Sequence, residues 1–252
     1  LLIGACGYDS SEALALYGAV TGMSLPVLMI PNSLIGSIAV VVAPEMSEHY
    51  YAGRRDRLKR DIEKTIKAAV FIAALLIPAL FTLGGDIGIM LFGNAFSGEV
   101  ITKFAFMLLP LCISMITTTA LNSMNCEVKT LIYFFIGALF MLVCIFALTP
   151  IAGIYSYMIG LTGSYVITAA LNLHLLRKKC PDAAYFKHLA ASAAICVFGS
   201  LFGLLLRRLT AELAPVLNVI ICGGAVTAFT LTAFWGLGMV SIEPVKKLFR
   251  RR

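Results

Sequence analysis

Long apolar stretches alternate with short polar segments along the whole chain. Each apolar stretch holds about 20 residues, which is enough for a helix to cross the ~30 Å hydrocarbon core of a bilayer. Because lipid offers the backbone no hydrogen-bond partners, each spanning stretch must be helical. The pattern predicts seven spans, at about 14–42, 66–83, 101–121, 131–148, 154–175, 189–206 and 216–239.

The composition agrees with this pattern. Hydrophobic residues make up 60% of the chain and charged residues 13%, and the mean hydropathy is +0.94. Soluble domains are close to half apolar and a quarter charged. We therefore expect an all-α, polytopic transmembrane helical bundle. The chain begins without Met and shows no signal-peptide pattern, so we expect it to be a piece of a longer protein.

The Lys and Arg residues predict an orientation. Seven follow the first span, one follows the third, four follow the fifth and five lie in the tail, which puts them all on one side. The other side holds Lys103, Arg207 and Arg208. Since the side richer in Lys and Arg is cytoplasmic, the C-terminus should be cytoplasmic and the segment before Leu14 outside.

Two connecting segments have apolar character. Residues 84–100, between the second and third spans, include a run too short to cross, so we expect a short interfacial or re-entrant helix there. The tail 240–252 mixes apolar residues with cations. It is expected either to lie along the anionic inner leaflet or to act as a plain positive-inside anchor.

The first span contains helix-breaking residues. Pro26 and Pro31 each remove a backbone donor, so this helix should kink or partly unwind. Mainly small residues recur there at spacings of three and four: Gly18, Gly22, Pro26, Met29, Ser33, Gly36 and Ser37. The Gly18–Gly22 pair is of the GxxxG type, which suits close helix contact. The span is either a bendable helix facing a transport pathway or an ordinary tightly packed one.

The third span becomes polar toward its cytoplasmic end. Its hydroxyls and amides belong to Ser114, Thr117, Thr118, Thr119, Asn122, Ser123 and Asn125. Ser114 and Asn122 would be buried at high cost without water or a partner, so a hydrated substrate cavity is one interpretation. Hydrogen bonding between helices is the other.

The PEMSE junction after the first span holds acidic residues. Pro44 should end the helix, because the residue before a proline is biased away from helical geometry. Glu45 and either Ser47 or Glu48 would then lie at the start of a following amphipathic helix, where acids favour the positive end. We expect a hinge role for Pro44, Glu45 and Glu48.

Other chemistry finds little support. The cations lie beside apolar spans, which argues against nucleic-acid binding. The seven cysteines show no metal-ligand spacing, and no metal or cofactor is predicted. No span carries a carboxylate near its middle, and no catalytic motif occurs, so we do not expect an enzyme.

The stretch 17–69 has a YG and a GxxLP in one helix, a further proline, a small-residue run, and a PxMSE signature before a basic connection. In this order of motifs it resembles the polysaccharide transporter branch of the multidrug/oligosaccharidyl-lipid/polysaccharide exporter superfamily, and the stage V sporulation protein B family in particular. The later LFGNAFSGEVI, ALNSMNCEVK and TPIAGIYSYMIG segments fit the same order.

The resemblance implies about fourteen spans in two lobes followed by two additional helices. Residues 1–176 would be the C-terminal transport lobe (helices eight to twelve), 177–188 a cytoplasmic linker, 189–239 the additional pair and 240–252 a basic tail. The N-terminal lobe of the same protein would be one partner, and the lipid bilayer and envelope-synthesis enzymes would be others.

The resemblance also implies a flippase that moves an undecaprenyl-pyrophosphate-linked sugar across the plasma or forespore membrane by alternating access. Lys103 would lie at the outer cavity mouth, Lys129 at the inner end, and Ser33, Ser37, Ser114, Thr117, Thr118 and Asn122 along the cavity. A cation-coupled drug or metabolite antiporter is an alternative. Another is a membrane glycosyltransferase or acyltransferase using Glu45, Glu48 and His49.

Overall fold

The computed structural model describes residues 2–181, 185–210 and 215–236, and all of its regular elements are helices. Their bounds are α1 Leu2–Cys6, α2 Ser10–Gly18, the π-helical turn η1 Ala19–Ser24, α3 Leu25–Tyr51, α4 Arg55–Phe92, α5 Ala95–Phe104, the 3₁₀ turn η2 Ala105–Met107, α6 Leu108–Ser123, α7 Glu127–Ala152, α8 Tyr155–Lys179, α9 Tyr185–Leu209 and α10 Pro215–Gly236.

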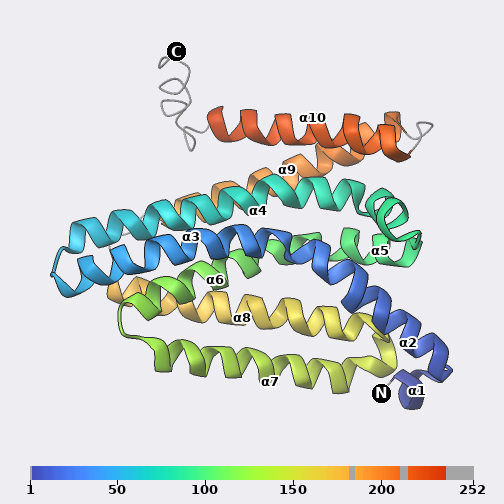
Figure 1. Cartoon of the computed structure of the whole chain (residues 1–252), viewed down its shortest axis with the longest axis horizontal. Helices are drawn as coiled ribbons and strands as arrows, with labels where there is room; N and C mark the ends of the chain where they lie inside the picture. Colours follow the sequence, from blue (N-terminus) through green and yellow to red (C-terminus); the bar gives the residue numbers. More distant parts are fainter. Residues whose placement is uncertain (1, 182–184, 211–214, 237–252) are drawn as a thin grey trace.

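The long helices lie roughly side by side in successive layers (Figure 1). α7 packs on α8, α8 on α6, and α6 on α3 and α4. α9 and α10 pack on each other and on α4. The core is apolar, and large side chains such as Leu28, Ile77 and Leu108 are fully buried in it. Every predicted span falls within one of these helical segments apart from Ile154, which directly precedes α8, and residues 237–239, which lie outside the described residues.

The first span bends where α2 meets α3 (Figure 1). The break is the π-helical turn η1, and it comes immediately before Pro26, which lies in the first turn of α3. Proline has no backbone N–H to donate to the carbonyl of the preceding turn. A widened π-helical turn changes the hydrogen-bond pattern there, so that the missing donor is tolerated. The buried Ser24 hydroxyl fills the turn by donating to the Ala19 carbonyl at 3.0 Å and to that of Ser97 at 3.0 Å. The predicted distortion is therefore confirmed ahead of Pro26, whereas α3 runs on through Pro31.

The PEMSE junction differs from the prediction. α3 continues through Pro31 and Pro44 and ends at Tyr51, so Pro44 does not end the helix. Glu45 and Glu48 lie inside its last turns and do not begin a new helix. The bias against helical geometry before a proline is a preference, and packing of the buried Met46 against the core outweighs it here. The chain turns instead at Gly53, whose φ of +68° suits glycine.

The short helix expected within residues 84–100 is present only in part, as α5 from Ala95, while the apolar run 87–92 belongs to α4. α4 runs on to Phe92 and ends at Gly93 in the left-handed conformation, and α5 follows at once. α4 and α5 approach closely there, since a Cβ on Gly88 would lie 2.3 Å from the Gly98 backbone. The glycines allow this contact, so the segment packs as helix against helix.

The α6–α7 turn depends on Asn125, the one non-glycine residue with positive φ (+57°) in the described part of the chain. Asn tolerates this left-handed conformation better than residues with a plain Cβ. We expect Asn125→Ala to lower the free energy of unfolding by about 1 kcal/mol and Asn125→Gly to leave it unchanged. Thermal unfolding in detergent would measure both, and an equal loss in the two variants would contradict the conformational explanation.

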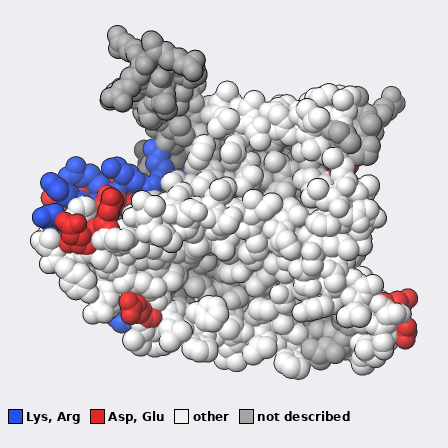
Figure 2. Space-filling view, viewed as in Figure 1, with Lys and Arg blue, Asp and Glu red and all other residues white. Residues whose placement is uncertain are grey.

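Within the described part of the chain, seven helical segments are long and apolar enough to cross a membrane: Ser10–Tyr51, Arg55–Phe92, Ala95–Ser123, Glu127–Ala152, Tyr155–Lys179, Leu189–Leu209 and Leu217–Gly236. Charged side chains are nearly absent from the middle of the visible surface (Figure 2). Large apolar side chains such as Phe135, Leu139 and Phe146 of α7 are exposed. Water would disfavour such an apolar surface, which indicates contact with the lipid bilayer.

The charges gather at the ends of the bundle. Lys and Arg are concentrated at the left end of Figure 2, around the start of α4. The α3–α4 turn, the α6–α7 turn and the C-terminal end of α8 lie at this end (Figure 1), which we name the basic end. The predicted cytoplasmic linker begins here, but residues 182–184 lie outside the described part. The tail 240–252 also lies outside it.

Candidate functional site

A groove of about 820 Å³ lies among α3, α6, α7 and α8. Hydroxyl and amide side chains line it, and so do the aromatic rings of Phe134 and Tyr165. Its polar lining residues are Asn32, Ser114, Thr118, Thr119, Asn122, Glu127, Thr130, Ser164 and Thr168. We name it the polar groove. Hydroxyls and amides surrounded by membrane-spanning helices are typical of sites that bind a polar substrate.

One wall of the polar groove comes from α6. Ser114, Thr118 and Asn122 are spaced by four residues, so a helix places them on one face. The Ser114 hydroxyl donates to the Leu111 carbonyl at 2.8 Å, which leaves its lone pairs free as acceptors. Asn122 accepts a hydrogen bond from the Thr130 hydroxyl of α7 at 2.7 Å. The wall therefore offers hydrogen-bonding groups and no charge.

The facing wall comes from α8, where Ser164, Thr168 and Asn172 repeat the same spacing of four. Asn172 is completely buried, and its Nδ2 donates to the Thr118 hydroxyl at 2.8 Å, directly behind the lining. Its Oδ1 has no hydrogen-bond partner among the described residues. A buried acceptor without a partner costs about 1–3 kcal/mol, so a water or substrate hydroxyl that reached it would be stabilised.

α7 closes the groove because it approaches α8 at Gly137. A Cβ at this position would lie 2.7 Å from the Ser164 hydroxyl and 2.8 Å from that of Thr168. Only glycine gives the two α8 hydroxyls this space. Glu127, at the start of α7, is the one charged residue in the groove lining and lies near the basic end.

The predicted cavity residues fall into three groups. Ser114, Thr118 and Asn122 line the polar groove. Thr117 is completely buried and donates to the Ile113 carbonyl at 2.6 Å, so it packs inside the bundle. The other predicted cavity residues lie outside the groove lining: Ser33, Ser37, Lys103 and Lys129.

Ser33 and Ser37 donate to carbonyls of their own helix, those of Ile30 and Ser33, at 2.7 and 3.0 Å. Lys103 lies at the end opposite to the basic end and donates to Glu99 at 2.5 Å. Its ammonium also lies 4.6 Å from the centre of the Tyr155 ring. Lys103 therefore belongs to a local surface cluster.

The predicted hinge residues are dispersed. A Cβ on Gly18 or Gly22 would meet no atom within 4 Å in the described part of the chain, so the close contact predicted for this pair is not observed there. Gly36 does pack, with Met115 of α6 lying 3.2 Å from its would-be Cβ. Glu48 pairs with Arg54 at 3.1 Å on the surface.

The three residues of the enzyme alternative do not form one cluster. Glu45 is exposed and Glu48 points to Arg54, as described above. His49 pairs separately with Asp61, at 2.7 Å between Nδ1 and Oδ2. No acid–base arrangement joins the three side chains.

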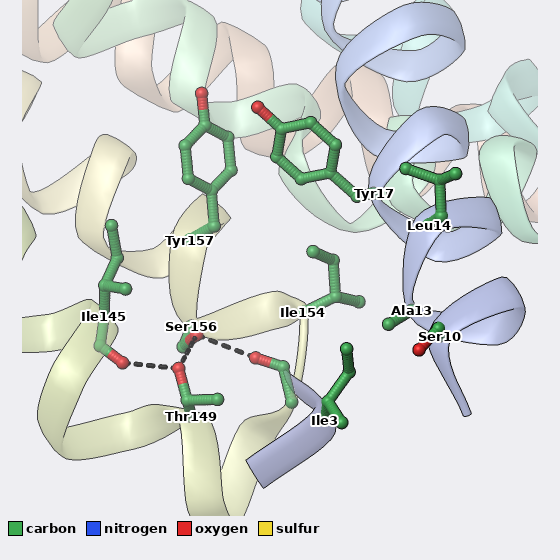
Figure 3. Close-up of a pocket in the computed structure, with 11 residues that line it drawn as sticks. Ile3, Ser10, Ala13, Leu14, Tyr17, Ile145, Thr149, Ile154, Ser156 and Tyr157 are labelled. Carbon is green, nitrogen blue, oxygen red and sulfur yellow. Dashed lines mark hydrogen bonds between the residues drawn. The ribbon is translucent and has the colours of Figure 1, made fainter. Parts of the chain in front are cut away.

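A second hollow, of about 470 Å³, lies near the opposite end between α1, α2 and the α7–α8 turn (Figure 3). Its walls are mostly apolar, with Ile3, Leu14 and Ile154 among them. The Thr149 and Ser156 hydroxyls bond to each other at 2.9 Å and to nearby carbonyls (Figure 3). Because these hydroxyls are already engaged, this hollow is a weaker candidate for binding a polar substrate than the polar groove.

The structure defines an α-helical, multi-pass membrane protein with a polar groove inside the bundle. No protein-family model matches the chain, and the comparisons with curated proteins and with solved structures found no match either. The groove chemistry and the sequence motifs therefore carry the functional argument.

Sequence reasoning missed Asn32, Thr130, Ser164, Thr168 and Asn172. A signal existed for the last three, because Ser164, Thr168 and Asn172 recur every four residues within the predicted fifth span. Polar residues repeating with a helical period inside an apolar span indicate a shared buried face. Asn32 and Thr130 gave no such signal, because Asn32 has no polar side chain four residues before or after it and Thr130 lies just before the predicted fourth span.

Proposed function

We propose that this protein is a flippase or exporter that moves a lipid-linked sugar, such as an undecaprenyl-pyrophosphate-linked saccharide, across the membrane by alternating access. The observation that carries the proposal is the polar groove. Its hydroxyls and amides suit the hydroxyls of a saccharide, and the rings of Phe134 and Tyr165 offer apolar faces beside them. The resemblance to polysaccharide transporters supports the same substrate class.

The first span supports the mechanism. Alternating access needs helices that change direction, and the π-helical turn Ala19–Ser24 already interrupts this span ahead of Pro26. The Ser24 hydroxyl in this turn donates a hydrogen bond to the Ser97 carbonyl of α5. A movement at η1 would therefore also displace α5. The hinge role is thus proposed for η1 and Pro26 more than for Pro44, Glu45 and Glu48.

The charge distribution supports an orientation. Lys and Arg gather at the basic end (Figure 2), and the side richer in these residues is cytoplasmic in multi-pass proteins. We place the basic end in the cytoplasm and the protein in the plasma membrane. The polar groove then lies nearer to the cytoplasmic side, where Asn122 and Glu127 mark one end of it.

Transport by the full-length protein in liposomes, with a fluorescent lipid-linked sugar, tests the proposal. Thr118→Val removes the hydroxyl that Asn172 contacts and keeps the side-chain volume. We expect about tenfold slower transport, because a lost partner for a buried polar group costs about 1–3 kcal/mol. The variant must first be shown to fold, by its elution profile and melting temperature.

Thr232→Val is the matched control, since it makes the same change at an exposed hydroxyl of α10 outside the groove. Its transport rate should equal that of the unmodified protein. Lack of sugar movement above that in empty liposomes would refute the proposed function. Equal rates for Thr118→Val and Thr232→Val would show that the groove is not part of the transport pathway.

A further inference from the structure

A pocket of about 600 Å³ opens at the basic end, between the α3–α4 turn, the α6–α7 turn and the C-terminal end of α8. It is separate from the polar groove, with which it shares no lining residue. Three cations line it, Arg55, Lys59 and Lys179, and Asp56 is its one lining carboxylate. We name it the basic pocket.

The three cations have no ion-pair partner among the described residues. His49, also in the lining, is held by Asp61 at 2.7 Å, so Asp61 is engaged by the histidine. The lining holds three cations against the single carboxylate of Asp56, and repulsion among this excess of like charges raises the free energy of the folded state. An anion in the pocket would relieve it.

The three cations also act on the same lining residue, Cys180. Burial raises the pKa of the Cys180 thiol, while the positive charges of Arg55, Lys179 and Lys59 act in the opposite direction. Cys180 is itself a lining residue, directly after α8. Cations from the start of α4 and the end of α8 therefore lie around the same pocket.

The remaining lining suits the membrane interface. Tyr50 and Tyr51 line the pocket, and Tyr51 is 71% exposed. Tyrosine is enriched where hydrocarbon meets the headgroup layer, because its ring is apolar and its hydroxyl is wet. Leu58 and Met124 add an apolar wall beside the cations. Basic pockets between transmembrane helices at such a level bind phosphate-bearing lipid headgroups.

We propose that the basic pocket binds the phosphate of an anionic phospholipid headgroup. Arg55 and Lys59 at the start of α4, together with Lys179 at the end of α8, supply the positive charge, and a tyrosine hydroxyl supplies a further donor. The bound lipid ties the end of α8 to the α3–α4 turn and stabilises the bundle at the basic end. This inference does not depend on the proposed transport function.

The test measures the melting temperature of the purified full-length protein in detergent while phosphatidylglycerol is added, with phosphatidylcholine and inorganic phosphate as parallel titrations. Phosphatidylglycerol should raise the melting temperature, and the other two additions should not. In Lys179→Gln, the apparent affinity for phosphatidylglycerol should fall about fivefold, the equivalent of ~1 kcal/mol per cation. The double variant Lys59→Gln/Lys179→Gln should lose about 25-fold.

Arg57→Gln is the control, since it removes an exposed cation from the same turn without touching the pocket lining. Arg57→Gln should keep the phosphatidylglycerol response. Lys179 is exposed, so Lys179→Gln should fold without disturbing the core. An equal loss in Arg57→Gln and Lys179→Gln would overturn the site, as would an equal response to phosphatidylcholine. A response to inorganic phosphate matching that to phosphatidylglycerol would overturn the lipid assignment in favour of a soluble phosphate ligand.

Discussion

Gly88→Ala should prevent the protein from folding stably, with a loss of about 3 kcal/mol or more in the free energy of unfolding. A Cβ on Gly88 would lie 2.3 Å from both the Cα and the N of Gly98. These are backbone atoms of α5, so no side-chain rotation relieves the overlap, and α4 and α5 must separate. Size-exclusion chromatography and thermal unfolding in detergent would measure the loss.

Gly85→Ala provides the matched control in the same turn of α4. Among the described residues its Cβ would meet only the Arg207 guanidinium, at 3.4 Å, which is an ordinary van der Waals distance, so no atom has to move. The control variant should melt within a few degrees of the unmodified protein. If Gly88→Ala does so too, α4 and α5 do not approach as closely as described.

The glycine contacts illustrate what the sequence could and could not predict. The GxxxG spacing occurs at Gly18–Gly22, Gly84–Gly88 and Gly199–Gly203. The second and third pairs pack closely against other described helices, and the first does not. The motif indicates that a helix has a face of small side chains, but it does not indicate which helix packs against that face. Prediction of the contact between Gly88 and Gly98 requires the position of α5 relative to α4, which depends on tertiary packing.

The seven spans could be predicted because hydropathy and span length depend on local composition alone. The same is true of the polar face of α6, where Ser114, Thr118 and Asn122 share a helical period. The end of α3 could not be predicted in this way. The local preference at Pro44 favours a helix end, and packing of Met46 against the core overrides it. Local rules fail where a tertiary contact contributes more free energy than the preference.

Asp86 and Arg207 are the clearest example of a long-range contact. From the sequence, both lie in polar connections between spans. In the structure Arg207 of α9 donates to the Asp86 carboxylate at 3.4 Å and to the Thr82 carbonyl at 2.9 Å. Asn218 of α10 donates to the other Asp86 oxygen at 3.3 Å. A separation of 121 residues between Asp86 and Arg207 hides this cluster from any local pattern.

Arg207→Met should lower the free energy of unfolding by about 2 kcal/mol. Breaking a fully buried ion pair costs ~3–5 kcal/mol because the remaining charge has no partner. Arg207 is 36% exposed and Asp86 12% exposed, so solvent reduces the cost here. Chemical unfolding followed by fluorescence of Trp235, the single tryptophan, would report it, since Trp235 lies on α10.

The double variant Asp86→Asn/Arg207→Met separates the ion pair from simple packing. It removes the carboxylate that Arg207→Met leaves without a cation, and the amide introduced in its place could still accept a hydrogen bond from Asn218. The double variant should therefore be more stable than Arg207→Met alone, with a coupling of about 1 kcal/mol between the two sites. Arg208→Met, at the exposed neighbouring position, should have no measurable effect. If the loss of stability in the double variant equals the sum of the losses in Asp86→Asn and Arg207→Met, the two residues act independently. Docking of α9 and α10 would then rest on the close glycine contacts, such as that of Gly203 with Thr82.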